Sequence, residues 1–369
     1  NNIDFGIEVD QTVEKVTLEL ENYQTGFATS DQNTTFEWTT SIGMATVRID
    51  VTNPEGFLYF NSHCYVRILV PESMTINPLN TLNVSCGAGN INLGNATEEG
   101  IAMDVNYLNL STTTGSIQIG KNFDTTYSSL SVTCDGGSFS SYQEEMKFVD
   151  GGVLALNGRG DFTFGNIVPT SASDNFFIQN NIESGSFSAG EVKADMSLRT
   201  INANINMNLY SGNLESNNLV NETNGMNLTI GTAKGEISLP FANNSNITIS
   251  NAEECDMFIN SNNAHINIDN VGSTSWIEAE AGSINVSLSD QTGDIFIVSE
   301  TAPINVTANQ NMNANLSASS ISGAVTLNYY QTSSFTAKFL NSKGEDRKDV
   351  TAEGYNTITN PMYINGGGA

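Results

Sequence analysis

The side chains that could carry out acid–base chemistry do not form a catalytic set in this chain. The two histidines, His63 and His265, lie about 200 residues apart, and each has only strand-like or turn-like neighbours. No Ser-His-Asp spacing, cluster of metal ligands or phosphate-binding loop accompanies them. The residues therefore predict no catalytic site, no metal site and no cofactor.

Carboxylates provide the enzymatic alternative. Polysaccharide-degrading enzymes built from stacked β-coils cut glycosidic bonds with acids that cluster on neighbouring coils. The candidates here are Asp269 with Glu278 and Glu280, and Asp290 with Asp294. Forty Asp and Glu in 369 residues bring acids together by chance, and no Arg or His accompanies these. We therefore expect a protein that is not an enzyme.

One tripeptide has the form of a receptor-binding motif. Arg159, Gly160 and Asp161 form an RGD sequence at an expected turn, where a receptor could reach it. Turns favour Gly for its positive φ and Asp for its local hydrogen bonds. The turn by itself explains these residue types, and we prefer this explanation to an integrin-like role.

Asparagine provides the candidate modification sites. Eleven residues stand in Asn-x-Ser/Thr sequons, about the number that 50 Asn would give by chance: Asn33, Asn83, Asn95, Asn109, Asn221, Asn227, Asn243, Asn246, Asn285, Asn305 and Asn315. Six of them alternate with apolar neighbours and are expected to face solvent: Asn83, Asn109, Asn227, Asn285, Asn305 and Asn315. In a secreted protein such positions accept N-linked glycans.

Composition excludes several classes of partner. Thirteen Lys and Arg stand against 40 Asp and Glu, which gives a net charge of −27. Nucleic acids and anionic membranes attract basic surfaces, so neither is an expected partner. No apolar run approaches the roughly 20 residues of a membrane-spanning helix. Because the chain starts at Asn1 rather than Met, we expect a processed, secreted product that is extracellular or on the cell surface.

A repeat organises the polar residues. The 50 Asn, 38 Ser and 36 Thr make up about a third of the chain, and these residue types suit turns and solvent-facing strand positions. The phrases LNVSCGAGNI, LNLSTTTGSI and LSVTCDGGSF begin at Leu82, Leu108 and Leu130. A small residue near the end of each phrase serves as an anchor. Anchors recur 18 to 29 residues apart, at Gly89, Gly115, Gly137, Gly160, Gly185, Gly212, Gly235, Ala264, Gly282, Ala302 and Gly323.

Apolar residues hold fixed places around the anchors. One follows every anchor by two positions, and apolar residues precede ten of eleven anchors by seven positions and ten of eleven by five. This alternation on both sides of a small residue indicates a strand, a tight corner and a second strand. Repetition with a period of this length is typical of stacked architectures. We therefore predict an all-β fold, a single-stranded β-solenoid of about eleven coils, with Gly at corners that need positive φ or close backbone approach.

Three regions follow along the chain. Residues 1–75 alternate less regularly and are expected to form a β-rich cap over the open edge of the first coil. Residues 76–330 hold the solenoid, a rod of roughly 50 Å if coils stack at about 4.8 Å. Residues 331–369 form a C-terminal coil or cap segment, and its INGGGA end has the form of a corner without its following strand.

The corner phrases also carry a resemblance. GSIQI, GDFTF, GSINV and GDIFI, each preceded by alternating strand residues, resemble those of adhesin-type β-solenoid domains, a family catalogued as a domain of unknown function. In that family a capping strand ending in Pro often precedes the coils, and CYVRILVP at Cys64 to Pro71 looks like one. The resemblance covers roughly residues 64 to 330 and implies a location on the surface or envelope.

Rung geometry constrains the four cysteines. Cys86 and Cys134 occupy equivalent places in the repeated phrase, but Thr112 holds that place in the coil between them. Two rungs separate the pair by roughly 9.6 Å, and a disulfide needs Cα atoms within about 7 Å. Cys64 precedes Cys86 by about one coil. We therefore predict a Cys64–Cys86 disulfide, with Cys134 and Cys255 unpaired.

Two functions fit these expectations. The first is a structural glycoprotein, the subunit of a cell-surface coat or of an extracellular fibre or filament, in which the chain forms homo-oligomers through its coil ends or a strand edge. The second is an adhesin whose lateral face binds a glycan or receptor. Exposed aromatics gathered on one face would favour the adhesin. The chain holds only two Trp, Trp38 and Trp276, so the sequence favours the structural function.

Overall fold

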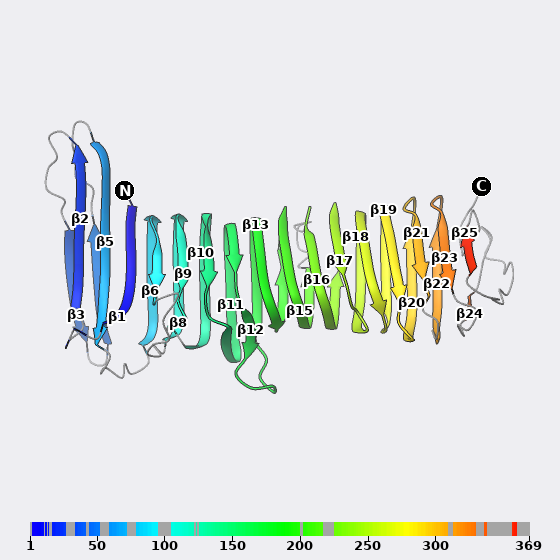
Figure 1. Cartoon of the computed structure of the whole chain (residues 1–369), viewed down its shortest axis with the longest axis horizontal. Coiled ribbons are helices and arrows are strands. Elements are labelled where there is room, and N and C mark those ends of the chain that lie inside the picture. The colour runs from blue at the N-terminus through cyan, green and yellow to red at the C-terminus, as the bar shows by residue number, and fades with distance from the viewer. Residues whose placement is uncertain are drawn as a thin grey trace.

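A computed structural model describes most of the chain, namely residues 2–10, 12, 14, 17–26, 34–41, 44–51, 59–71, 79–94, 105–121, 123, 125–199, 202–216, 225–308, 313–329, 336–337 and 356–359. These residues form an elongated rod in which strands lie side by side along the long axis (Figure 1). Neighbouring coils pair in parallel, and the predicted all-β solenoid is confirmed with about ten turns. Among the described residues, no helix is long and apolar enough to cross a membrane.

The strands fall into three groups along the chain. The first group is β1 (Asn2–Asp10), β2 (Thr17–Gly26), β3 (Thr34–Ser41), β4 (Met44–Val51) and β5 (Tyr59–Pro71). The coils are built from β6 (Leu79–Ala88), β7 (Ile91–Leu93), β8 (Val105–Thr114), β9 (Ser116–Ile119), β10 (Thr126–Ser141), β11 (Glu145–Thr163), β12 (Asn166–Pro169), β13 (Phe177–Lys193), β14 (Asp195–Leu198), β15 (Ala203–Ser216), β16 (Asn227–Leu239), β17 (Ser245–Ile249), β18 (Glu254–Val271), β19 (Ser275–Leu288), β20 (Gln291–Ser299), β21 (Ile304–Thr307), β22 (Asn313–Ser320) and β23 (Val325–Tyr329). The last strands are β24 (Thr336–Ala337) and β25 (Asn356–Thr359).

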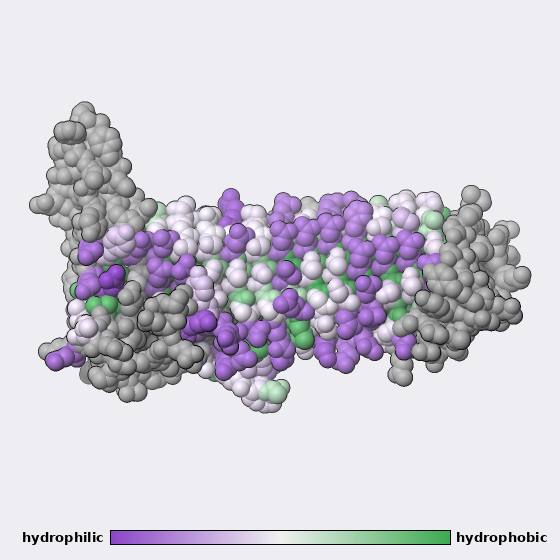
Figure 2. All heavy atoms as spheres, in the orientation of Figure 1, coloured by the Kyte–Doolittle hydropathy of each residue, from purple (hydrophilic) through white to green (hydrophobic). Residues whose placement is uncertain are grey.

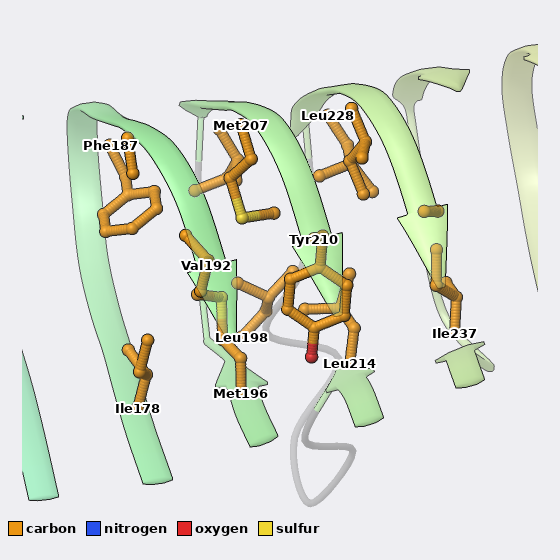
Figure 3. Close-up of a cluster of buried hydrophobic side chains, with 14 of the residues drawn as sticks. Ile178, Phe187, Val192, Met196, Leu198, Met207, Tyr210, Leu214, Leu228 and Ile237 are labelled. Carbon is orange, nitrogen blue, oxygen red and sulfur yellow. The ribbon is translucent and has the colours of Figure 1, made fainter. Parts of the chain in front are cut away.

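Apolar side chains stack down the inside of the rod in ladders. The residues two positions after the first corner pair from coil to coil: Ile91, Ile117, Phe139, Phe162, Phe187, Ile205, Leu228, Ile247, Ile266, Ile284, Ile304 and Val325. The backbone of Ile91 also pairs with Phe5 of β1. From Ile91 to Val325 all residues of this ladder are buried. Figure 3 shows this interior between β13 and β16, where side chains such as Phe187, Met207 and Leu228 succeed one another on adjacent coils. Burial of this continuous ladder is the main force that holds the coils together.

Two of the sequence anchors mark a different corner of the coil. Gly212 pairs with Gly235, and Gly212 lies against Ala194 rather than Gly185. The ladder one position after the first corner instead runs from Ser186 through Asn204, Asn227, Asn246 and His265. The chain therefore makes four steps between Gly185 and Ala264, where the sequence pattern counts three. A coil turns at more than one corner, and glycine at the second corner is also followed by buried apolar residues, so the pattern alone does not separate the corners.

Close backbone packing explains glycine at the first corner. Gly115 has a φ of 137°, and a Cβ there would lie 2.0 Å from the carbonyl oxygen of Gly89 on the coil before. Gly137 repeats the contact on the next coil, with 1.9 Å between a Cβ and the carbonyl oxygen of Gly115. Any side chain here would collide with the neighbouring backbone, as the sequence pattern predicts.

The N-terminal strands do not stack in sequence order. β1 pairs in parallel with β5 on one side and with β7 of the first coil on the other. β2 pairs antiparallel with β5, and β3 and β4 form a separate two-stranded sheet. The first strand of the chain is thus inserted between the predicted capping strand and the first coil.

This insertion makes the predicted Cys64–Cys86 disulfide wrong. Cys64 lies in β5, which among the described strands pairs with β1 and β2 rather than with β6, and Cys86 is a free, buried thiol. Cys134 and Cys255 are also free and buried, as expected. Thr112 pairs with both Cys86 and Cys134, which confirms the two-rung separation of those residues. Burial raises the pKa of the Cys86 thiol to about 11 and those of Cys134 and Cys255 to about 12.

Candidate ligand-binding face

One column of outward-facing residues can be followed along the rod. We call it the outer column, and its members pair in register on successive coils: Asn83, Asn109, Ser131, Ala155, Gln179, Ser197, Glu215, Ser238, Phe258, Trp276, Phe296 and Ser317. All members are small or polar except three consecutive ones. Phe258, Trp276 and Phe296 form an aromatic ladder on β18, β19 and β20, which lie side by side in Figure 1.

Strand alternation holds the aromatic ladder outward. The next residue on each strand, Ile259, Ile277 or Ile297, is fully buried in the core, so the residue before it must face solvent. Phe258 is 39% exposed, Trp276 41% and Phe296 39%. The rings of Trp276 and Phe296 stack with centroids 5.6 Å apart and planes inclined by 30°. Three large apolar side chains in contact with water on one face form a surface patch that needs an explanation.

Carboxylates flank the ladder on both sides. Asp256 and Asp294 each precede a ladder residue by two positions, and both are exposed on the same side of their strands. Glu278 follows Trp276 by two positions and accepts a hydrogen bond from Trp276 Nε1 at 3.3 Å. Glu280 is exposed farther along β19, and Glu300 is exposed directly after the end of β20. The patch therefore combines flat apolar rings with hydrogen-bond acceptors and negative charge.

The lysine on the coil before the aromatic ladder, Lys234 of β16, is already paired with a carboxylate. Lys234 Nζ lies 2.8 Å from Glu254 Oε2, and this hydrogen bond raises the pKa of the lysine. Its charge is thus directed at Glu254. Figure 2 shows hydrophilic side chains over much of the described surface on the side in view, in keeping with the chain's net charge of −27.

Comparison with known families agrees with this architecture. The Toastrack DUF4097 family model matches residues 5–355, nearly the whole chain. The chain belongs to the Toastrack family. This confirms the resemblance to β-solenoid domains of unknown function. No curated protein and no solved structure gives a significant match.

In this Toastrack chain, Asp269 is not brought together with Glu278 and Glu280. Asp269 lies in the second half of β18, where its Oδ1 accepts a hydrogen bond from Ser287 Oγ at 3.0 Å. Glu278 and Glu280 lie in the first half of β19, on the face that carries the aromatic ladder. The two halves of these strands lie on either side of a corner, so Asp269 faces another direction. Among the described residues, no group of three or more His, Cys, Asp or Glu could hold a metal ion.

The histidines and the RGD tripeptide occupy ordinary strand positions. His265 is exposed between Asn246 and Ser283 of the neighbouring coils, and its Nδ1 lies 2.9 Å from Ser283 Oγ. The side chain of His63 lies outside the described residues. Arg159 is paired with Asp135 and Glu183, at 3.4 and 3.2 Å from its Nε. Asp161 accepts a hydrogen bond from Ser186 Oγ at 2.7 Å. The tripeptide is thus tied to the coils before and after it.

The structure places most of the sequons on the outside of strands. Asn83, Asn109, Asn227 and Asn246 are exposed, while Asn285 and Asn305 are half-buried between neighbouring rungs. Asn243 lies half-buried in the turn before β17, and Asn315 lies in β22 with its side chain outside the described residues. Asn33, Asn95 and Asn221 also lie outside them.

The aromatic ladder was missed by sequence reasoning, although a signal exists. Each member is followed at once by isoleucine, as Phe258-Ile259, Trp276-Ile277 and Phe296-Ile297, at spacings of 18 and 20 residues. These spacings equal one coil in this part of the rod. Reading aromatic-isoleucine pairs at the coil period would have placed the three rings on one face.

Proposed function

We propose that this protein is a non-enzymatic, extracellular or cell-surface rod that binds a neutral or basic glycan through the aromatic ladder. The observation that carries the proposal is the occurrence of Phe258, Trp276 and Phe296 at three consecutive positions of the outer column, where Trp276 and Phe296 stack. The sequence favours a structural function because the chain has few Trp, but exposed aromatics gathered on one face support the adhesin alternative.

The chemistry of the patch suits a sugar chain. An aromatic ring has a negative face, which attracts the weakly positive C–H groups on the apolar face of a pyranose ring. Carboxylates beside the ladder can accept hydrogen bonds from sugar hydroxyls, and Glu278 is already held beside the Trp276 ring. A ladder that continues over three coils offers contacts to several successive sugar units rather than to one.

Charge narrows the class of glycan. Asp256, Glu278, Glu280, Asp294 and Glu300 surround the ladder with negative charge, which repels uronic acids, sialic acids and sulfated sugars. Neutral sugars and amino sugars carry no such penalty. We therefore expect binding to neutral or basic oligosaccharides and none to acidic ones.

A binding screen tests this proposal. Wild-type protein is titrated calorimetrically with cellohexaose, chitohexaose, a chitosan hexamer and hexagalacturonate, and the titration is repeated with Trp276→Ala and Tyr107→Ala. Tyr107 is 45% exposed on β8, far from the ladder along the chain, and serves as the matched aromatic control. We expect at least tenfold weaker binding for Trp276→Ala and unchanged binding for Tyr107→Ala. Binding of hexagalacturonate alone, or equal loss in both variants, would contradict the proposal.

A structural role as the subunit of a coat or fibre is the second candidate. The register of the apolar ladder continues from Ile91 to Val325 without a break, which supports a stiff rod. At the described ends of the sheet, β2 and β25 pair antiparallel with the strands beside them and leave one strand edge for a further copy. Electron microscopy across a concentration series would show filaments, whereas single rods at every concentration would count against this role.

A further inference from the structure

Six sequons form three pairs of direct neighbours across the coils. Asn83 pairs in register with Asn109, Asn227 with Asn246, and Asn285 with Asn305. Members of a pair are 19 to 26 residues apart in sequence. They lie on adjacent parallel strands, which are spaced by about 4.8 Å.

Amide hydrogen bonds join the side chains of each pair. Nδ2 of Asn109 donates to Oδ1 of Asn83 at 2.6 Å, Nδ2 of Asn246 donates to Oδ1 of Asn227 at 2.6 Å, and Nδ2 of Asn305 donates to Oδ1 of Asn285 at 2.8 Å. Two of the ladders continue to asparagines that are not sequons. Asn227 donates to Asn204 and Asn285 donates to Asn267, both at 2.8 Å.

The atom that donates in these ladders is also the atom that would carry the glycan. N-linked glycosylation replaces one Nδ2 hydrogen with a sugar. The hydrogen bond then survives only if the remaining hydrogen points at Oδ1 of the neighbouring asparagine. A branched glycan is much wider than one strand spacing. Two glycans attached to register partners would therefore compete for the same space above the sheet.

We propose that each of the three pairs carries at most one N-linked glycan in the folded protein, although both members are sequons. This rests on the extracellular location in the proposed function. Glycans are attached before the strands pair, so the exclusion acts on folding. Chains modified at both members cannot bring the two strands into register, and they remain in the unfolded fraction.

Expression with a secretory leader in a cultured animal cell line tests the proposal. The secreted, folded protein is analysed by intact mass and by site-resolved glycopeptide mass spectrometry, and the retained intracellular fraction is analysed in parallel. We expect the summed occupancy of each pair to stay at or below one glycan per secreted molecule. Molecules modified at both members should appear in the retained fraction.

A substitution at one member of a pair should change the glycan occupancy of the other member. Asn285→Gln should raise the occupancy of Asn305 in the secreted protein, because chains modified at Asn305 then carry no second glycan that blocks folding. Asn315 is the internal control, since its register partners Asp294 and Thr336 are not sequons, and its occupancy should not change. Near-complete occupancy of both Asn285 and Asn305 in secreted protein would overturn the proposal. If the protein binds no oligosaccharide but shows the predicted glycan occupancy of the sequon pairs, only the proposed function is contradicted.

Discussion

Trp276 stacks on Phe296 of the next coil, with 5.6 Å between ring centroids, at a position where most coils carry a small or polar residue. The core does not contain these rings, because the neighbouring isoleucines fill the interior at these coils. Each ring leaves about two fifths of its surface in water. The exposed part of this pair is the surface that the proposed glycan would cover.

Gly115 should be among the least replaceable residues of the rod. In Gly115→Ala the new Cβ meets the carbonyl oxygen of Gly89 at 2.0 Å, and the backbone has a φ of 137° that alanine rarely adopts. We expect a loss of more than about 2 kcal/mol in the free energy of unfolding. Gly87→Ala is the control, because a Cβ there has no atom within 4 Å, and it should change stability by less than about 0.5 kcal/mol. Urea unfolding of both variants measures the difference, and equal stabilities would contradict the corner geometry.

The buried thiols predict a loss of stability at alkaline pH. Burial raises the pKa of Cys134 to about 12, from about 9.0 when the chain is unfolded. The folded state therefore holds this proton more tightly. The resulting stability is fully present below about pH 9 and is lost as the pH rises toward 12.

A comparison of wild type with Cys134→Ala separates the contribution of this thiol from that of other groups that titrate at the same pH. Between about pH 8 and pH 11 the wild type should lose on the order of 2 kcal/mol more than the variant. The measurement is urea unfolding across the pH series. Parallel curves for the two proteins would show that the thiol is not buried as described.

The hydroxyl of Tyr210 offers a test of polar pairing inside the core. It donates a hydrogen bond to the carbonyl oxygen of Ala194 at 3.0 Å, and burial raises the pKa of this tyrosine. Figure 3 shows the ring among apolar side chains such as Leu214. Tyr210→Phe should lower the free energy of unfolding by about 1 kcal/mol, because the hydrogen bond is lost. The exposed Tyr107→Phe should have almost no effect, and a similar loss in both would count against a specific buried bond.

The coil repeat could be predicted because it is local and reinforced on every turn. An apolar residue two positions after a small corner residue packs against its equivalent on the next coil, as Ile266 does against Ile284. Selection for this ladder leaves the same phrase in the sequence each time. Where glycine also stands at a second corner, as at Gly212, the phrase no longer says which corner it marks.

The position of β1 could not be predicted in the same way. Its contact with the first coil joins residues far apart in sequence, and Asn90 N donates to Asp4 Oδ1 at 2.8 Å across 86 positions. No periodic pattern encodes such a pairing. The disulfide prediction failed for this reason, because it assumed that the strand of Cys64 stacks directly on the first coil.

The aromatic ladder can be found in the sequence only when the local coil length of 18 to 20 residues replaces the average period. Phe258 and Trp276 are 18 residues apart in sequence but are direct neighbours across β18 and β19. Coil lengths vary between steps, so an average period misplaces side chains that lie on the outer face. Interior residues tolerate this uncertainty because most coils hold an apolar residue there, whereas a short ladder on the surface does not.

Fluorescence of Trp276 provides the most direct measurement of the central claim. Trp38 and Trp276 are the two tryptophans of the chain, so Trp38→Phe leaves Trp276 as the single tryptophan reporter within the ladder. On titration with cellohexaose or a chitosan hexamer, we predict a saturable blue shift of its emission. The affinity obtained from this shift should fall at least tenfold in Phe296→Ala and stay unchanged in Tyr107→Ala. If calorimetry detects binding of either oligosaccharide while the emission of Trp276 stays constant, the sugar binds elsewhere and the account is contradicted.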